Sequence, residues 1–223
     1  MSGTARAAVV AELVETIAAV CRPHPVRVAI DGPDAAGKTT LADELAAGLR
    51  GRGREAIRAS IDGFHRPRAA RYRRGPDSPE GYYEDSFDYA ALREALLDPL
   101  GPHGSRRYRR AVFDYRTDGS VHVEPEVAAV DAVLLFDGVF LLRPELAEAW
   151  DLRIFVVVRP EESLRRALDR DRDLFGSRDE VGRRYRTRYL PGQRLYAARV
   201  RPAERADVVV ENDDPARPSL RRP

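Results

Sequence analysis

Five short runs of apolar residues recur along this 223-residue chain, separated by segments with helical periodicity. They span residues 26–30, 56–61, 132–136, 153–158 and 207–211. Each run is almost continuously apolar and rich in β-branched residues, which is typical of strands buried on both faces of a parallel sheet. The pattern therefore predicts a five-stranded parallel sheet.

Helical patterns fill the spaces between these runs. They cover residues 38–50, 88–98, 161–173 and 179–200. The last segment is expected to break near Pro191, because proline cannot donate the backbone hydrogen bond of a helix interior. Residues 7–20 predict an amphipathic first helix that is too short to span a bilayer. Alternating strands and helices indicate an α/β fold with helices on both faces of the sheet.

Two segments depart from this alternation. Residues 106–125 alternate polar and apolar positions around the turn "TDGS", which predicts a β-hairpin inserted between the second and third parallel strands. Residues 62–87 are rich in Pro, Gly, Tyr and Arg and predict an ordered but irregular loop of the kind that is often functional. We expect one domain over residues 1–212 and a frayed tail over 213–223.

Composition narrows the function classes. The 38 basic and 36 acidic residues nearly cancel to a net charge of +2, and they are interleaved. This pattern lacks the segregated basic face of a nucleic-acid-binding protein. The single cysteine, Cys21, excludes an internal disulfide, and the four histidines lack the spacing of a zinc site. We expect a cytoplasmic protein that acts on small molecules, with no nucleic-acid or membrane partner.

A phosphate-binding motif follows the first apolar run. "GPDAAGKT" (32–39) matches G-x-x-x-x-G-K-[ST], with a predicted strand before it and a predicted helix after it. Its glycines permit a loop whose amides point at phosphate oxygens, and the Thr39 hydroxyl can bind Mg²⁺. ATP and Mg²⁺ are the expected cofactors. The residues expected to bind the nucleotide are Gly32, Asp34, Ala35, Ala36, Gly37, Lys38, Thr39 and Thr40.

Lys38 is the only lysine among many arginines. A compact ammonium on a flexible stem can bridge phosphate oxygens inside such a loop, whereas a planar guanidinium has the wrong shape. We therefore expect Lys38 to be catalytic. A single lysine also excludes the N-K-x-D base-recognition motif of GTPases, which removes the commonest guanine-specific class.

Two aspartates follow apolar runs at the edge where α/β sheets bind ligands. Asp62, in "SIDGFH", can orient an acceptor hydroxyl and accept its proton during phosphoryl transfer. Asp137, which ends "LLFDG", has the position of a Walker B acid that holds Mg²⁺ directly or through water. The spacing also allows a plain structural role, in which Asp62 caps a turn and Asp137 is a turn residue before glycine.

The order of these motifs resembles the uridine kinase and phosphoribulokinase family. The similarity covers residues 26–212 and includes "GPDAAGKTT", "DGFH", "FDYRTD", "LLFDGVFLL" and "ADVVVEND". It implies a P-loop NTPase fold and ATP-dependent phosphoryl transfer to a small-molecule hydroxyl. It also implies a lid over about residues 165–185 that brings arginines onto the phosphates. Members of the family are often homo-oligomers, but the sequence indicates no interface.

The resemblance also implies roles for individual residues on the acceptor side. Asp62 matches the general base, Asp85 a ribose-binding aspartate, and Phe113 an aromatic position near the base of uridine. The further acceptor-side candidates are His65, Tyr115, Asp118 and Arg170. Asp118 departs from the pattern, because uridine kinases tend to have histidine there.

Three functions stay open for this sequence. The leading one is a kinase for the 5′-hydroxyl of a pyrimidine nucleoside, uridine or cytidine. The second is a kinase for a pantothenate-like molecule or a sugar phosphate, because the arginines of "HRPRAARYRR" (65–74) could bind an anionic acceptor. The third is an ATP-gated regulatory protein without an acceptor substrate.

Overall fold

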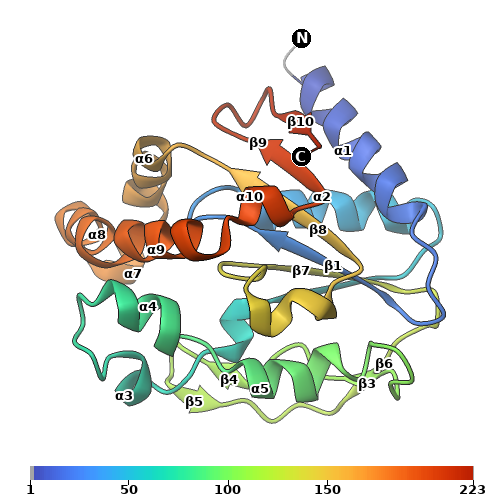
Figure 1. The fold of residues 1–223 in the computed structure, drawn as a ribbon, viewed down its shortest axis with the longest axis horizontal. Coiled ribbons are helices and arrows are strands. Elements are labelled where there is room, and N and C mark those ends of the chain that lie inside the picture. Colours follow the sequence, from blue (N-terminus) through green and yellow to red (C-terminus); the bar gives the residue numbers. More distant parts are fainter. Residues whose placement is uncertain (1–2, 223) are drawn as a thin grey trace.

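The computed structural model describes residues 3–222 and is built around a six-stranded sheet (Figure 1). The strand order is β10-β9-β8-β1-β7-β2, and all neighbours are parallel except β10 and β9. The strands are β1 (Val26–Asp31), β2 (Ala56–Ser60), β7 (Val133–Gly138), β8 (Leu152–Val157), β9 (Val208–Glu211) and β10 (Ser219–Arg221). The five predicted parallel strands are confirmed.

The sixth strand comes from the segment that was expected to be a frayed tail. That expectation was wrong for residues 219–221, because β10 pairs antiparallel with β9 and Leu220 lies opposite Val210. Leu220 also packs against the apolar cluster on one face of the sheet. Contact with this cluster explains why a charged, proline-rich segment ends in an ordered edge strand.

Side chains from the strands point alternately to two apolar layers. Val133 and Leu135 of β7 join the layer formed with α1 (Gly3–Ala18) and α2 (Lys38–Arg50). Leu134 and Phe136 join the opposite layer, which includes side chains from α4 (Pro79–Asp85), α5 (Tyr89–Leu92) and α9 (Leu190–Val200). Helices therefore cover both faces of the sheet, as predicted (Figure 1). No helix within residues 3–222 has the length and apolarity needed to cross a membrane.

The predicted helices are present, with local departures. Helix α2 has the predicted bounds, and residues 161–173 correspond to α6 (Pro160–Arg170) and α7 (Arg172–Phe175). The expected helix over 179–200 consists of α8 (Arg178–Arg184), a π-helical turn at Tyr185–Tyr189 and then α9. The expected break near Pro191 is absent, because the segment stays helical through this proline and a π-helical turn directly precedes α9. The chain continues through α10 (Pro202–Arg205) into β9.

The segment expected to be an irregular loop is largely helical. It contains a 3₁₀ helix at Ile61–Phe64, then α3 (Arg68–Arg71) and α4. Ser78 caps α4 by accepting a hydrogen bond from the Gly81 amide at 3.0 Å, and Pro79 occupies its first turn. After α4 the chain enters α5 and a π-helical turn at Arg93–Leu97.

The inserted hairpin is present between β2 and β7. Its strands are β3 (Arg107–Tyr108), β4 (Phe113–Asp114), β5 (Gly119–Ser120) and β6 (Glu126–Val127). Strand β4 pairs with β5 and β3 with β6, so the pairing extends two residues beyond the predicted limit of 125. The Val112 amide donates to the Gly63 carbonyl at 2.9 Å, which joins the hairpin to the 3₁₀ helix after β2. The hairpin thus reaches the edge of the sheet where β1, β2 and β7 end.

Candidate active site

The loop between β1 and α2 forms an anion cradle. Gly37 has φ +89°, and a Cβ atom at this position would lie 2.8 Å from Asn212 Nδ2, so the loop requires glycine here. Within the described residues, the amides of Gly37, Lys38 and Thr39 have no hydrogen-bond acceptor. Because these amides open the 13-residue helix α2, their donors and the helix dipole favour a bound phosphate.

Lys38 is buried beside this loop, and its Nζ donates to the Pro33 carbonyl at 2.6 Å. Burial lowers the pKa of Lys38, while the nearby carboxylates of Asp34, Asp31 and Asp137 oppose that change. A phosphate oxygen would give this ammonium a charged acceptor in place of a carbonyl. The side chain is therefore suited to the phosphate-binding role predicted for it.

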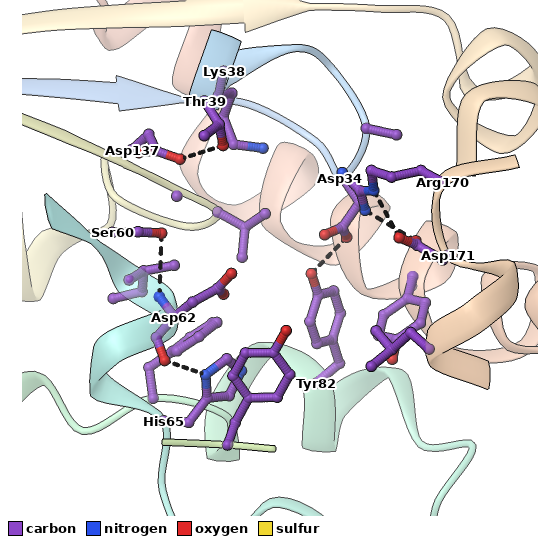
Figure 2. Close-up of a pocket in the computed structure, with 18 of the residues that line it drawn as sticks. Asp34, Lys38, Thr39, Ser60, Asp62, His65, Tyr82, Asp137, Arg170 and Asp171 are labelled. Atoms are coloured by element: carbon purple, nitrogen blue, oxygen red, sulfur yellow. Dashed lines mark hydrogen bonds and ion pairs between the residues drawn. The ribbon is translucent and has the colours of Figure 1, made fainter. Parts of the chain in front are cut away.

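Thr39 and Asp137 meet at the start of α2 and the end of β7. The Thr39 hydroxyl donates to Asp137 Oδ2 at 2.8 Å (Figure 2). Arg58 donates to Asp137 Oδ1 at 2.9 Å. Within residues 3–222, no group of three or more His, Cys, Asp or Glu side chains could hold a metal by itself. Mg²⁺ in nucleotide sites uses one or two protein oxygens with phosphate oxygens and water, so this hydroxyl and carboxylate fit that ion.

A cavity of about 380 Å³ extends from the P-loop to the 3₁₀ helix, the hairpin and residues 165–185, which were expected to form a lid and are called the lid segment below. Figure 2 shows Asp34 and Asp62 pointing into it from opposite sides. Ser60 Oγ accepts a hydrogen bond from the Asp62 amide at 3.3 Å, which fixes the start of the 3₁₀ helix. The cavity thus brings Asp62 together with Lys38 and Asp137.

The Asp62 carboxylate is open to solvent in the cavity, yet protein surrounds it closely enough to limit its hydration. Desolvation, with the negative charges of Asp34 and Asp137, raises its pKa from 3.8 to about 6. A carboxylate with this pKa is a stronger base than an ordinary aspartate and is ionised at neutral pH. The site therefore contains a candidate general base.

His65 and Tyr115 form an aromatic wall beside Asp62. His65 Nδ1 donates to the Asp62 carbonyl at 3.0 Å, and its ring lies 4.6 Å from Phe87 and 4.9 Å from Tyr115 between centroids. Desolvation lowers the pKa of His65 to about 4, so the imidazole is neutral near pH 7. It can shape the cavity and does not add a positive charge to it.

Arg170 lies on the cavity wall formed by the segment that was expected to be a lid. Its Nε donates to Asp171 Oδ1 at 2.6 Å, and the Tyr185 hydroxyl donates to Asp171 Oδ2 at 3.1 Å. Asp171 is buried, whereas Arg170 is exposed. The aspartate thus holds the arginine at the cavity wall (Figure 2).

Asp34 has partners that the motif did not predict. Its Oδ2 accepts hydrogen bonds from the Tyr82 hydroxyl and from Gln193 Nε2, each at 2.6 Å. Tyr82 lies on α4 and Gln193 on α9, so the side chain of Asp34 joins the P-loop to two helices on the acceptor side. No signal in the sequence paired these distant residues.

Three acceptor-side candidates do not line the cavity. Asp85 is buried and accepts hydrogen bonds from Arg73 Nη2 at 2.6 Å and Arg74 Nε at 2.8 Å. Phe113 is buried within the hairpin. Asp118 lies in the hairpin turn and accepts from the Arg68 amide and from Arg71 Nη2. The structure therefore gives no contact between these residues and the space beside Asp62.

Several cavity residues were not singled out from the sequence. The examples closest to the acceptor side are Ser60, Tyr82, Phe87 and Arg116. Arg116 lies in "FDYRTD", one residue after Tyr115, so its place in the hairpin could have been noticed. Tyr82 had no such signal, because a tyrosine in a proline- and glycine-rich segment is also expected as a packing residue.

A model of the phosphoribulokinase/uridine kinase family matches residues 27–213, which is most of the chain. The chain belongs to this family. The family match agrees with the motif order and with the fold. Uridine-cytidine kinase B of Dictyostelium discoideum is 28% identical over 149 residues, which are 66% of this chain and 59% of that protein. The chain therefore spans less than two thirds of that relative.

Solved structures with the same fold include proteins described as kinases. A Bacillus stearothermophilus protein described as a possible uridine kinase has a TM-score of 0.69 and 24% identity, over 90% of this chain and 96% of that one. D-glycerate 3-kinase from Cryptococcus neoformans has a TM-score of 0.56 and 15% identity, over 83% of this chain and 86% of that one. At these identities the likeness supports the P-loop kinase fold and leaves the acceptor open.

Proposed function

We propose that this family member is an ATP- and Mg²⁺-dependent kinase that transfers a phosphoryl group to the hydroxyl of a small molecule. The observation that carries the proposal is the shared cavity, in which the Asp62 carboxylate faces the same space as Lys38 and the Thr39–Asp137 pair. A cavity with a phosphate cradle at one end and a candidate base at the other provides for two substrates, a donor and an acceptor.

In this mechanism Asp62 orients the acceptor hydroxyl and accepts its proton. The hydroxyl oxygen forms a bond to the γ-phosphorus, and the bond from that phosphorus to the β–γ bridging oxygen breaks, which releases ADP. The raised pKa of Asp62, about 6, brings its basicity closer to the value suited to proton transfer at neutral pH.

The P-loop and lid stabilise the charge that moves during transfer. Lys38 and the amides at the start of α2 donate to phosphate oxygens, and Arg170 can add a further positive charge from the lid. Thr39 and Asp137 would hold Mg²⁺, which neutralises charge on the phosphates when bound. Asp34 has a positioning role, because its bonds to Tyr82 and Gln193 connect the loop to the acceptor-side helices.

The identity of the acceptor is a separate question. The name of the Dictyostelium relative favours a pyrimidine nucleoside, as the motif order did. The residues that the resemblance linked to ribose and base, Asp85 and Phe113, are engaged elsewhere and do not line the cavity. A non-nucleoside alcohol is therefore the second candidate, and it is favoured by this specific placement.

An acceptor screen tests the proposal. The protein is incubated with ATP, Mg²⁺ and one candidate acceptor at a time, and phosphorylated products are identified by mass spectrometry. The candidates include uridine, cytidine, pantothenate, glycerate, free sugars and sugar phosphates. We expect at least one acceptor to gain a phosphoryl group. ATP hydrolysis that no acceptor stimulates or diverts would instead favour the ATP-gated regulatory function.

A further inference from the structure

A second cavity, of about 1020 Å³, lies beside the candidate active site. Tyr115, Arg116, Arg170, Leu174 and Phe175 line both cavities, so the two spaces adjoin. No residue of the P-loop lines the second cavity, whereas the first includes Lys38 and Thr39. The second cavity therefore extends from the acceptor end of the site, away from the nucleotide phosphates. We call it the arginine cavity.

The arginine cavity has a strong excess of positive charge. Its wall contains five arginines and one acidic residue, Asp173. The arginines come from α3, the hairpin and the lid segment and are Arg68, Arg71, Arg116, Arg170 and Arg184. Such convergence from three separate parts of the chain differs from the interleaved charges elsewhere in the sequence.

Acidic side chains neutralise only part of this wall. Arg71 forms an ion pair with Asp118 at 3.1 Å. Two further ion pairs, each at 2.6 Å, join Arg170 to Asp171 and Arg184 to Glu180. Arg116 donates to the Tyr115 hydroxyl at 3.5 Å, and Arg68 bonds Asp118 through its backbone amide. Across residues 3–222, no carboxylate lies within ion-pair distance of the guanidinium of either Arg68 or Arg116.

Arg71 is the most informative member of the cluster. It is only 7% exposed, and its guanidinium, which has five N–H donors, makes one hydrogen bond among the described residues, from Nη2 to Asp118 Oδ1. Its Nε is buried with no partner among the described residues. A buried guanidinium with unused donors is unfavourable unless a further acceptor completes its hydrogen bonding. Arg71 also lines the arginine cavity, so an anion there would give its guanidinium a further acceptor.

We propose that the arginine cavity binds an anionic group of the phosphate acceptor, so that the substrate is a small hydroxylated molecule carrying a phosphate or a carboxylate. Guanidinium groups suit both anions because they form paired, charge-assisted hydrogen bonds. The hydroxyl to be phosphorylated lies near Asp62, and the anionic group lies near Arg71 and Arg116. This inference rests on the proposed kinase function and names its substrate class.

Matched acceptor pairs test the inference. Ribose is compared with ribose 5-phosphate, and glycerol with glycerate and glycerol 3-phosphate, by steady-state kinetics with saturating ATP and Mg²⁺. We expect the anionic member of a pair to have the higher kcat/KM, by roughly tenfold or more from one charged hydrogen bond. A comparison of kcat/KM for glycerate and for glycerol 3-phosphate shows whether the cavity prefers a carboxylate or a phosphate.

Variants connect that preference to the cavity. Arg71→Met should raise KM for the anionic acceptor by roughly 10- to 100-fold and change KM for its neutral partner little. Arg116→Met removes an exposed side chain and should show the same selectivity without a risk to folding. The control is Arg205→Met, an exposed arginine on α10 outside both cavities.

The outcomes separate this inference from the proposed function. Phosphoryl transfer with equal or better use of neutral acceptors, or variants that affect both members of a pair alike, would overturn the inference and leave the kinase function standing. Absence of transfer to every acceptor would count against the kinase function. In that case, calorimetric binding of ribose and ribose 5-phosphate to the ADP-loaded protein decides the inference. The inference is supported if Arg71→Met weakens the binding of ribose 5-phosphate and leaves that of ribose unchanged. It is overturned if the two compounds bind equally well or if neither binds detectably.

Discussion

Replacing Asp62 by asparagine removes the candidate base and keeps the size of the side chain. General-base catalysis typically contributes about 10²- to 10⁴-fold, so we expect kcat of Asp62→Asn to fall by that factor. Binding of ATP should change little, because Asp62 lies at the acceptor end of the cavity, across from the P-loop (Figure 2).

The pH dependence of the unmodified protein gives a second, quantitative test. With a pKa of about 6, Asp62 is about 97% ionised at pH 7.5 and about 9% ionised at pH 5, so kcat should fall about tenfold between them. With the ordinary pKa of 3.8, the same carboxylate would stay more than about 90% ionised at pH 5 and the rate would hardly change.

The assay is a coupled measurement of ADP release with the best acceptor, from pH 5 to 8, for the natural protein, Asp62→Asn and a control. Asp131→Asn is the matched control, since Asp131 is exposed and precedes β7 at the end of the strand away from the cavity. A kcat of Asp62→Asn within tenfold of the natural value, or an acid decline that the variant retains in full, would refute the assignment of Asp62 as base.

Three further predictions concern the donor end and its support. Lys38→Arg should lose turnover by roughly 100-fold or more without a lower melting temperature, because the guanidinium does not fit the loop; near-normal kcat would contradict this. Asp137→Asn should raise the Mg²⁺ concentration for half-maximal rate by roughly tenfold, and an unchanged Mg²⁺ titration would contradict it. Burial raises the pKa of Asp31 from 3.8 to about 6, so the natural protein should lose about 2 kcal/mol relative to Asp31→Asn as pH rises from 4 to 7. Urea unfolding at both pH values checks this, and an equal change in both proteins would contradict it.

The donor half of the site was predictable because its information is local. "GPDAAGKT" lies between a strand and a helix in eight consecutive residues, and Thr39 meets Asp137 because β1 and β7 are adjacent parallel strands. A continuous apolar run sets where each strand ends, so the position of Asp137 at the end of β7 followed from sequence. The five parallel strands were predictable for the same reason.

The acceptor half depends on contacts between distant residues, which no local pattern determines. Asp85 stands in a segment that resembles a ribose-binding motif, but its carboxylate binds Arg73 and Arg74, which precede α4 by several residues. Arg71 belongs to the basic run "HRPRAARYRR", and its burial beside Asp118 depends on how the hairpin turn meets α3. The basic run suggested anion binding from sequence alone. Where its arginines lie relative to the candidate active site became clear only from the structure.

The edge strand β10 illustrates a third kind of limit. Its sequence lies in a tail with three prolines and three arginines at 213–223 and has no strand periodicity. The strand forms because β9 offers an unpaired edge beside an apolar cluster. Tertiary pairing here overrides a weak local preference.

The fate of the γ-phosphate tests the central claim most directly. With γ-labelled ATP, Mg²⁺ and each acceptor in turn, the label is followed into organic phosphate ester and into inorganic phosphate. The kinase function predicts that, with the correct acceptor, most of the label appears in the ester and that Asp62→Asn abolishes this transfer. Label recovered only as inorganic phosphate with every acceptor, at a rate that the acceptors do not change, would contradict it.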